Sequence, residues 1–227
     1  MNSSSDDRRI SPVNRTREQA RRYYDRMSRF YDYVSGPFER KYAFRTLDLL
    51  AAREGEAILE IGFGTGHCLR KIALSVGETG NAYGIDISPG MLEVTKRRLE
   101  KARLLDRVEL YCGDATCLPF DDNVIDGMFV SFTLELFDTP EIPVVLKEVM
   151  RVLISGGRIT IAAMSKKGGE SFMVRLYEWV HNKWPEYADC RPIFLEESLT
   201  KTGYGIKSKE MVKLFGLPIE IIAARKN

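Results

Sequence analysis

One stretch decides the fold: Ala57-Ile58-Leu59-Glu60-Ile61-Gly62-Phe63-Gly64-Thr65-Gly66-His67. A short apolar run turns through three glycines, and apolar residues then recur at a helical spacing from Cys68 onward. This order predicts a buried strand, a tight turn and the start of a helix. Glycines let the backbone approach a ligand closely, and a helix N-terminus presents free amide groups, so the turn is a candidate binding site.

Strands and helices alternate after this turn. We expect strands at 57–61, 81–86, 107–112, 124–130 and 158–163. We expect helices at 66–76, from the cap Ser88 with Pro89 in the first position, and from the cap Thr139 to Leu153. Repeated units of this kind predict a parallel sheet with helices on both faces. Strands near 204–213 and 218–225 share the linker 214–217, which is so short that they must form an antiparallel hairpin.

The segments outside these units differ in composition. Residues 1–16 are polar and charged, which predicts a disordered tail. Residues 17–53 are helical and aromatic, and Gly36-Pro37 divides them into helices near 17–34 and 38–53 that we interpret as a lid. Residues 54–227 then form the core, with inserts near 131–140 and 164–200 that include expected helices near 170–183 and 194–202.

Bulk properties narrow the class of protein. The 227 residues carry a formal net charge of +2, so we expect no nucleic-acid partner and at most peripheral membrane contact. There is no apolar run of about 18 residues and no signal-peptide core. The four cysteines form no C-x-x-C pair and the two histidines complete no zinc pattern, so we expect a cytoplasmic protein without a metal site.

Spacing around the glycines favours a nucleoside over a dinucleotide. A dinucleotide turn needs a glycine at its sixth position, where this chain has His67, which disfavours a nicotinamide oxidoreductase. Asp86 ends the second expected strand, where a carboxylate accepts from both hydroxyls of a ribose. Asp114 follows the third strand and is placed to accept from the amine of a base. The turn carries no Lys or Arg for a phosphate.

Four motifs in this order resemble the class I S-adenosylmethionine-dependent methyltransferases. They are Leu59-Glu60-Ile61-Gly62-Phe63-Gly64-Thr65-Gly66, Tyr83-Gly84-Ile85-Asp86-Ile87-Ser88, Gly113-Asp114-Ala115-Thr116-Cys117-Leu118-Pro119-Phe120 and Val149-Met150-Arg151-Val152-Leu153. The segment 24–32, with two Tyr-Asp pairs, resembles the ubiquinone/menaquinone C-methyltransferases, and 34–39 resembles the phosphatidylethanolamine N-methyltransferases. The resemblance implies an α/β, Rossmann-like, mostly parallel sheet of seven strands with a terminal antiparallel hairpin and a helical lid.

The resemblance also implies a cofactor site for S-adenosyl-L-methionine. The turn glycines would pass under its methionine part, Glu60 would hold the amino group and Asp86 the ribose. Asp114 would accept from the adenine amine. The full set of cofactor-binding residues that we expect is Tyr31, Glu60, Gly62, Gly64, Gly66, Asp86, Ile87, Met91, Asp114, Ala115 and Ser131.

Several alternatives stay open from the sequence. Glu60 is equally suited to cap the amides of the glycine turn. We assign no residue as catalytic, and His67 and Glu135 are the candidate general bases. The expected reaction is methyl transfer to a small, lipophilic acceptor by in-line displacement. A binding protein that has lost turnover and a phospholipid-headgroup N-methyltransferase are the alternative functions.

Overall fold

The structure is a computed structural model that describes residues 13, 16–28, 30–34, 36–167 and 190–227. One sheet of seven strands has the order β3-β2-β1-β4-β5-β7-β6. All pairs from β3 to β5 are parallel, whereas β7 pairs antiparallel with β5 and with β6. The predicted sheet and its terminal hairpin are therefore confirmed. The strands are β1 Ala57–Ile61, β2 Asn81–Asp86, β3 Val108–Cys112, β4 Ile125–Ser131, β5 Leu153–Met164, β6 Tyr204–Leu214 and β7 Leu217–Lys226.

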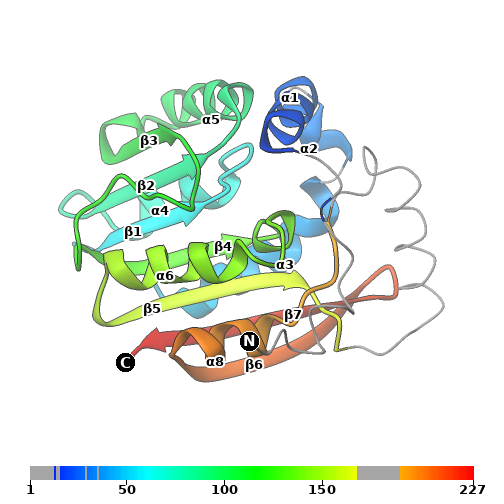
Figure 1. The fold of residues 1–227 in the computed structure, drawn as a ribbon. Coiled ribbons are helices and arrows are strands. Elements are labelled where there is room, and N and C mark those ends of the chain that lie inside the picture. Colours follow the sequence, from blue (N-terminus) through cyan, green and yellow to red (C-terminus); the bar gives the residue numbers. More distant parts are fainter. Residues whose placement is uncertain (1–12, 14–15, 29, 35, 168–189) are drawn as a thin grey trace.

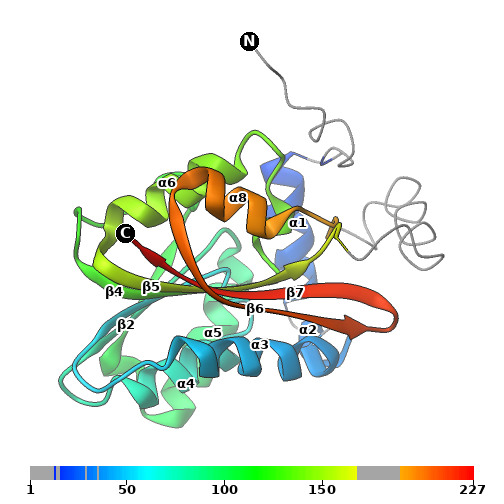
Figure 2. The ribbon, with the colours of Figure 1, turned by 90° about the horizontal axis from the view of Figure 1, so that it is seen from below.

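Helices cover both faces of the sheet, as the strand–helix alternation predicts. Figures 1 and 2 show α3, α4 and α5 on one face and α6 and α8 on the other. The α-helices are α1 Arg17–Met27, α2 Tyr31–Val34, α3 Gly36–Leu50, α4 His67–Ser75, α5 Pro89–Ala102, α6 Ile142–Val152 and α8 Leu195–Thr202. Short 3-10 turns are η2 Leu105–Arg107 and η3 Leu134–Leu136. Among the described residues, no helix is long and apolar enough to cross a membrane.

The side chains of β1 point alternately to the two faces of the sheet, which explains how an apolar layer forms on each face. Ile58 packs in the layer of α3, α4 and α5, whereas Leu59 and Ile61 pack in the layer of α6 and α8. All three side chains are buried. Since successive residues of a strand point to opposite faces, a run of apolar residues is what a strand covered on both sides requires.

Local capping residues confirm one predicted helix start and correct another. Ser88 Oγ accepts from the Met91 amide at 3.1 Å, and Pro89 occupies the first position of α5. Thr139 does not cap α6, which starts at Ile142. The Thr139 hydroxyl instead accepts from Nη1 of Arg191 at 2.9 Å, a partner far away in the sequence.

Three element boundaries also differ from the prediction. The first helix ends at Met27 and a separate short helix, α2, follows. Gly36-Pro37 forms the first turn of α3, where proline is tolerated, and does not precede it. β5 starts at Leu153 and takes in Gly156, whose φ of +73° suits glycine in an irregular stretch of strand. The helix expected near 170–183 lies outside the described residues, as does most of the expected tail.

The strand order places a crevice at the carboxyl ends of the strands. The chain runs outward from β1 through β2 to β3, and then returns to the other side of β1 with β4. In open α/β sheets, ligands bind where the strand order reverses in this way. In this sheet the reversal lies directly beside the glycine turn that follows β1.

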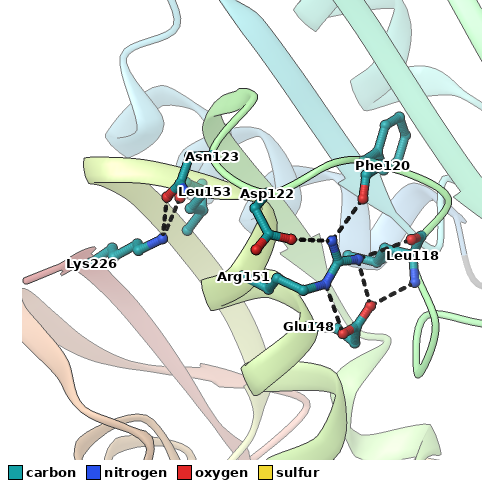
Figure 3. A network of polar contacts seen from close by, with 8 residues as sticks. All are labelled: Leu118, Phe120, Asp122, Asn123, Glu148, Arg151, Leu153 and Lys226. Carbon is teal, nitrogen blue, oxygen red and sulfur yellow. Dashed lines mark hydrogen bonds and ion pairs between the residues drawn. The ribbon is translucent and has the colours of Figure 1, made fainter.

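Arg151 of α6 fixes the loop that follows β3 (Figure 3). Its guanidinium donates to the carbonyl oxygens of Phe120 at 2.8 Å and Leu118 at 3.1 Å. It also pairs with Asp122 and with Glu148, each at 2.8 Å. A single side chain therefore binds two carbonyl oxygens and one carboxylate of a loop that has no regular secondary structure, and its ion pair with Glu148 on the same helix holds it in place.

We expect Arg151→Ala to lower the free energy of unfolding by about 1–3 kcal/mol, because the loop carbonyls lose a charged donor. Denaturant unfolding measures the change. Arg97→Ala is the matched control, since Arg97 pairs with Glu93 on the exposed side of one helix, and such a pair contributes about 0.3–0.5 kcal/mol. Equal losses in the two variants would show that the loop does not depend on Arg151.

Candidate functional site

A cavity of about 370 Å³ lies at the carboxyl ends of β1, β2 and β4, and residues of α1 and α2 line its outer side. It combines polar groups from the strand ends with apolar side chains from both walls, as small-molecule sites commonly do. The described residues that line it are Val13, Thr16, Arg17, Ala20, Tyr24, Tyr31, Ile61, Gly62, Gly64, Ile85, Asp86, Ile87, Met91, Gly113, Asp114, Ala115, Ser131, Phe132, Thr133, Leu136, Phe137, Asp138, Pro140 and Glu141.

Most of the residues predicted from the sequence meet at this cavity. Those that line it are Tyr31, Gly62, Gly64, Asp86, Ile87, Met91, Asp114, Ala115 and Ser131. Glu60 and Gly66 are not among the lining residues. Glu60 is buried in β1, two residues before the turn, and Gly66 is buried at the start of α4.

Each glycine of the turn is needed for a different reason. All three have positive φ, from +51° to +78°. A Cβ at Gly64 would meet no atom within 4 Å, because this glycine faces the cavity. A Cβ at Gly62 would collide with Thr133, and one at Gly66 would lie 2.5 Å from Cγ2 of Thr95. Thr95 also donates to the Gly64 carbonyl at 2.9 Å, so Gly66 keeps the turn against α5 and does not face the cavity.

Asp86 connects the glycine turn to the start of α5. Its Oδ2 accepts from the Gly64 amide and its Oδ1 from the Ser88 amide, each at 2.9 Å. Burial raises the pKa of this carboxyl to about 6, although the two amide hydrogen bonds lower it and offset part of the effect. The carboxyl group of Asp86 therefore lies at the cavity wall, where further hydrogen-bond donors would stabilise its ionised form.

Two buried polar atoms next to the turn have no hydrogen-bond partner within the described part of the chain. They are Oε2 of Glu60 and Oγ of Ser131. Burial, and then the nearby charge of Asp86, raise the pKa of Glu60 well above its usual range. Since unpartnered buried polar atoms are costly, this end of the cavity is suited to a ligand that carries a polar or cationic group. Oε2 does not cap the amides of the turn.

Arg17 spans the opposite end of the cavity, a role that its sequence context does not predict. Its guanidinium pairs with Asp114 through Nη1 and with Oε1 of Glu141 at 2.5 Å through Nη2. Asp114 also accepts from the amide of Thr116 at 2.9 Å and from its hydroxyl at 2.8 Å. Nothing local distinguishes Arg17 from the other arginines of the N-terminal segment, because its partners lie about a hundred residues away.

Apolar side chains line the part of the cavity beyond Ser131. Phe132, Leu136 and Phe137 come from the segment that follows β4. Phe132 has a φ of +50°, an uncommon conformation for a bulky residue, and such outliers concentrate at functional sites.

Neither candidate base identified from the sequence is among the residues that line the cavity. Glu135 is fully buried and accepts from the Met164 amide at 3.1 Å. His67 lies 3.1 Å from Oδ1 of Asp32 through Nε2. Burial, and then the charge of Arg98, lower the pKa of His67. Both side chains have structural partners, so a general-base role stays without support from the geometry.

Comparison with known proteins finds one family model. The description of that model is the ubiE/COQ5 methyltransferase family, and it matches residues 2–190. Among curated relatives, the demethylmenaquinone methyltransferase of Staphylococcus aureus strain JH9 is 35% identical over 154 residues, which is 66% of this chain. The match spans 62% of the length of that relative.

Solved structures share the fold at low sequence identity. A geranyl diphosphate C-methyltransferase from Streptomyces coelicolor A3(2), in complex with Mg²⁺, geranyl-S-thiolodiphosphate and S-adenosyl-L-homocysteine, superposes with a TM-score of 0.75 at 13% identity. The match covers 96% of this chain and all of that one (100%). The [4+2]-cyclase SpnF has a TM-score of 0.73 at 21% identity, with 95% and 97% of the two chains covered. A cyclase with this fold means that the site must decide the function.

We expect Gly66→Ala to destabilise the protein more than Gly64→Ala. Both substitutions put an alanine at positive φ, which costs about 1–2 kcal/mol. Only the Cβ at position 66 would also displace Thr95, and overpacking of this kind adds about 1–3 kcal/mol. Denaturant unfolding of both variants measures the difference, and equal losses would mean that the contact with Thr95 does not fix the turn.

Proposed function

Because the chain belongs to the ubiE/COQ5 methyltransferase family, we propose that it transfers a methyl group from S-adenosyl-L-methionine to a small, lipophilic acceptor of the quinone type. The observation that carries the proposal is the order of polar groups along one cavity. Oγ of Ser131, which has no partner among the described residues, lies at the end of the cavity next to the glycine turn, Asp86 follows at the end of β2, and Asp114 follows after β3. Oε2 of Glu60, also without a described partner, is buried in β1 next to the same turn and does not line the cavity. An amino acid, a ribose and a base need partners in this order.

The residues present fit this cofactor. Glu60, directly or through water, and Ser131 would hold its amino-acid end, which would supply the partner that their buried atoms lack. Asp86 would accept from the ribose hydroxyls, and Ile87 and Met91 would flank the adenine. Asp114 and the amide of Ala115 would face the adenine edge. We assign Gly66 to the turn itself, since its contact is with Thr95.

The chain's own residues mainly bind, orient and exclude water in this proposal. When bound, the cofactor would supply a methyl group that the charge of a sulfonium already activates, so the largest contributions of the protein are positioning and desolvation. Tyr24 and Tyr31, whose ring centroids lie 6.4 Å apart, would cover the outer side. Phe132 and Phe137 would form the wall on the acceptor side.

The charges around the cavity support an acceptor without phosphate. Among the described lining residues, Arg17 is the only Lys, Arg or His, and it already pairs with Asp114 and Glu141. A phosphorylated acceptor or a phospholipid headgroup would meet these carboxylates and Asp138, and the described residues that line the cavity offer it no further cation. An uncharged, ring-shaped acceptor suits the apolar wall better, as the name of the curated relatives suggests for those proteins.

We also propose a division of the chain into a lid and a core. α1 and α2 supply Arg17, Tyr24 and Tyr31 to the cavity and would act as the lid. α3 lies within the predicted lid segment 17–53, but it packs Leu47 and Leu50 into the layer that covers the sheet.

Formation of S-adenosyl-L-homocysteine tests the proposed activity. The protein is incubated with S-adenosyl-L-methionine and a reduced demethylated menaquinone, and the product is measured by mass spectrometry. Geranyl diphosphate and phosphatidylethanolamine are the matched charged acceptors. We expect turnover with the quinol alone. Turnover with either charged acceptor would overturn the assignment of the acceptor, and cofactor binding without turnover on any acceptor would favour a binding protein.

We expect affinity for 5′-methylthioadenosine to fall as the pH drops through about 6, the raised pKa of free Asp86. Ribose hydroxyls donate to the ionised carboxylate, so the bound form has a lower pKa, and affinity is lost by about tenfold per pH unit below the free value. This probe lacks the amino-acid group, so Glu60 does not contribute.

Calorimetry between about pH 5 and pH 8 measures the profile. Asp86→Asn is the control, and we expect it to bind more weakly and without this pH dependence. A flat profile in the unmodified protein would mean that the ribose does not contact Asp86.

A further inference from the structure

Two Tyr-Asp pairs stand seven residues apart in the segment that covers the cavity. Tyr24-Asp25 lies in α1 and Tyr31-Asp32 opens α2. Both tyrosines line the cavity. Both aspartates bind the core of the protein instead of facing solvent, and each of them does so at the start of a helix.

Asp25 binds the N-terminus of α5. Its Oδ1 accepts from the hydroxyl of Ser88 at 2.6 Å and from the amide of Gly90 at 2.8 Å. Ser88 is the capping residue of α5 and stands two positions after Asp86. The two helices approach so closely that a Cβ at Gly90 would lie 3.1 Å from the Cα of Asp25. A carboxylate is stabilised at this position by the free amides and the dipole of the helix.

Asp32 binds the glycine turn and the N-terminus of α4. Its Oδ1 accepts from the hydroxyl of Thr65 at 2.6 Å and lies 3.1 Å from Nε2 of His67. Its Oδ2 accepts from Nη2 of Arg98 at 2.5 Å. Burial alone would raise the pKa of Asp32, but the hydrogen bonds from Thr65 and Arg98 outweigh it and lower the pKa. This carboxylate is therefore charged and held from several sides.

The two aspartates therefore bind the two backbone segments on which the cofactor site depends. Thr65 belongs to the turn between Gly64 and Gly66, and Ser88 follows Asp86. In each pair the tyrosine that lines the cavity is the residue directly before the aspartate. Whatever holds the aspartate in place thus restricts where the neighbouring ring can lie.

We infer that Asp25 and Asp32 are positioning residues, which hold Tyr24 and Tyr31 against the cofactor by binding the helix starts that follow the cofactor-binding loops. This inference rests on the proposed function, since it assigns the tyrosines to the same cofactor. A positioning role and a purely structural role of the aspartates predict different affinities in variants that lack the tyrosine. If each aspartate acts through its tyrosine, its loss should have little effect once that tyrosine is gone.

A double-mutant cycle tests this dependence, with affinity for S-adenosyl-L-homocysteine measured by calorimetry. We expect Asp25→Ala to weaken binding by about tenfold, on the scale of a lost hydrogen bond to a charged group. In the Tyr24→Ala background the same substitution should change affinity by less than about twofold, because the effects of substitutions at coupled residues do not add. Asp32→Ala and Tyr31→Ala form the second cycle, with the same expectation.

Matched variants separate positioning from general packing. Asp25→Asn keeps an oxygen that accepts from Ser88 and Gly90, so we expect near-normal affinity. Glu18→Ala removes an exposed carboxylate from the same helix and should leave affinity unchanged. If Asp25→Ala does not fold, Thr65→Val removes one donor to Asp32 at similar volume. We expect it to weaken binding about threefold, and only when Tyr31 is present.

Each outcome has one meaning. The positioning role would be overturned if each aspartate substitution weakened binding as much in the tyrosine variant as in the unmodified protein. It would also be overturned if the aspartate variants bound S-adenosyl-L-homocysteine with unchanged affinity. Absence of binding by the unmodified protein would overturn the proposed function and, with it, the positioning role that rests on that function. Weak binding by Asp25→Asn, equal to that of Asp25→Ala, would also overturn the assigned hydrogen bonds.

Discussion

The carboxylate of Asp86 joins two backbone segments that lie far apart in the sequence, and the rest of the site depends on this junction. It accepts from the amide of Gly64 in the turn after β1 and from the amide of Ser88 at the start of α5. Ser88 in turn donates to Asp25 of α1, so the hydrogen bonds continue into the helix that covers the cavity. Burial raises the pKa of Asp86 because the ionised carboxylate loses contact with water. A ligand that donates hydrogen bonds to this carboxylate offsets that desolvation cost.

The carboxylates and the one arginine that line the described part of the cavity determine which ligands match its charges. Asp86 and Asp114 lie along one wall, and Arg17 compensates Asp114 and Glu141 at the far end. In the proposed function, the polar groups would bind a nucleoside with an amino-acid tail, and the apolar residues after β4 would contact the methyl acceptor. The shared fold alone would not separate these possibilities, since one of its solved examples is a cyclase.

The sequence predicts those features that depend on short-range patterns. The bounds of β1 and β2 and the cap at Ser88 follow from apolar runs and neighbouring turn residues. Asp86 is found in the same way, since it ends a strand at a fixed spacing from the glycines. Features set by distant partners are not predictable from one sequence. Thr139 looks like a cap until Arg191 takes its hydroxyl, and Arg17 has a role only because the fold brings Glu141, 124 residues away, beside it.

A crystal structure of the protein with S-adenosyl-L-homocysteine tests the central claim most directly. We expect both ribose hydroxyls to donate to Asp86, and the amino group to lie within reach of Glu60, directly or through one water. The rings of Tyr24 and Tyr31 should lie on the outer side of the ligand. A well-ordered ligand whose ribose lies away from Asp86, or one bound outside this cavity, would contradict the account.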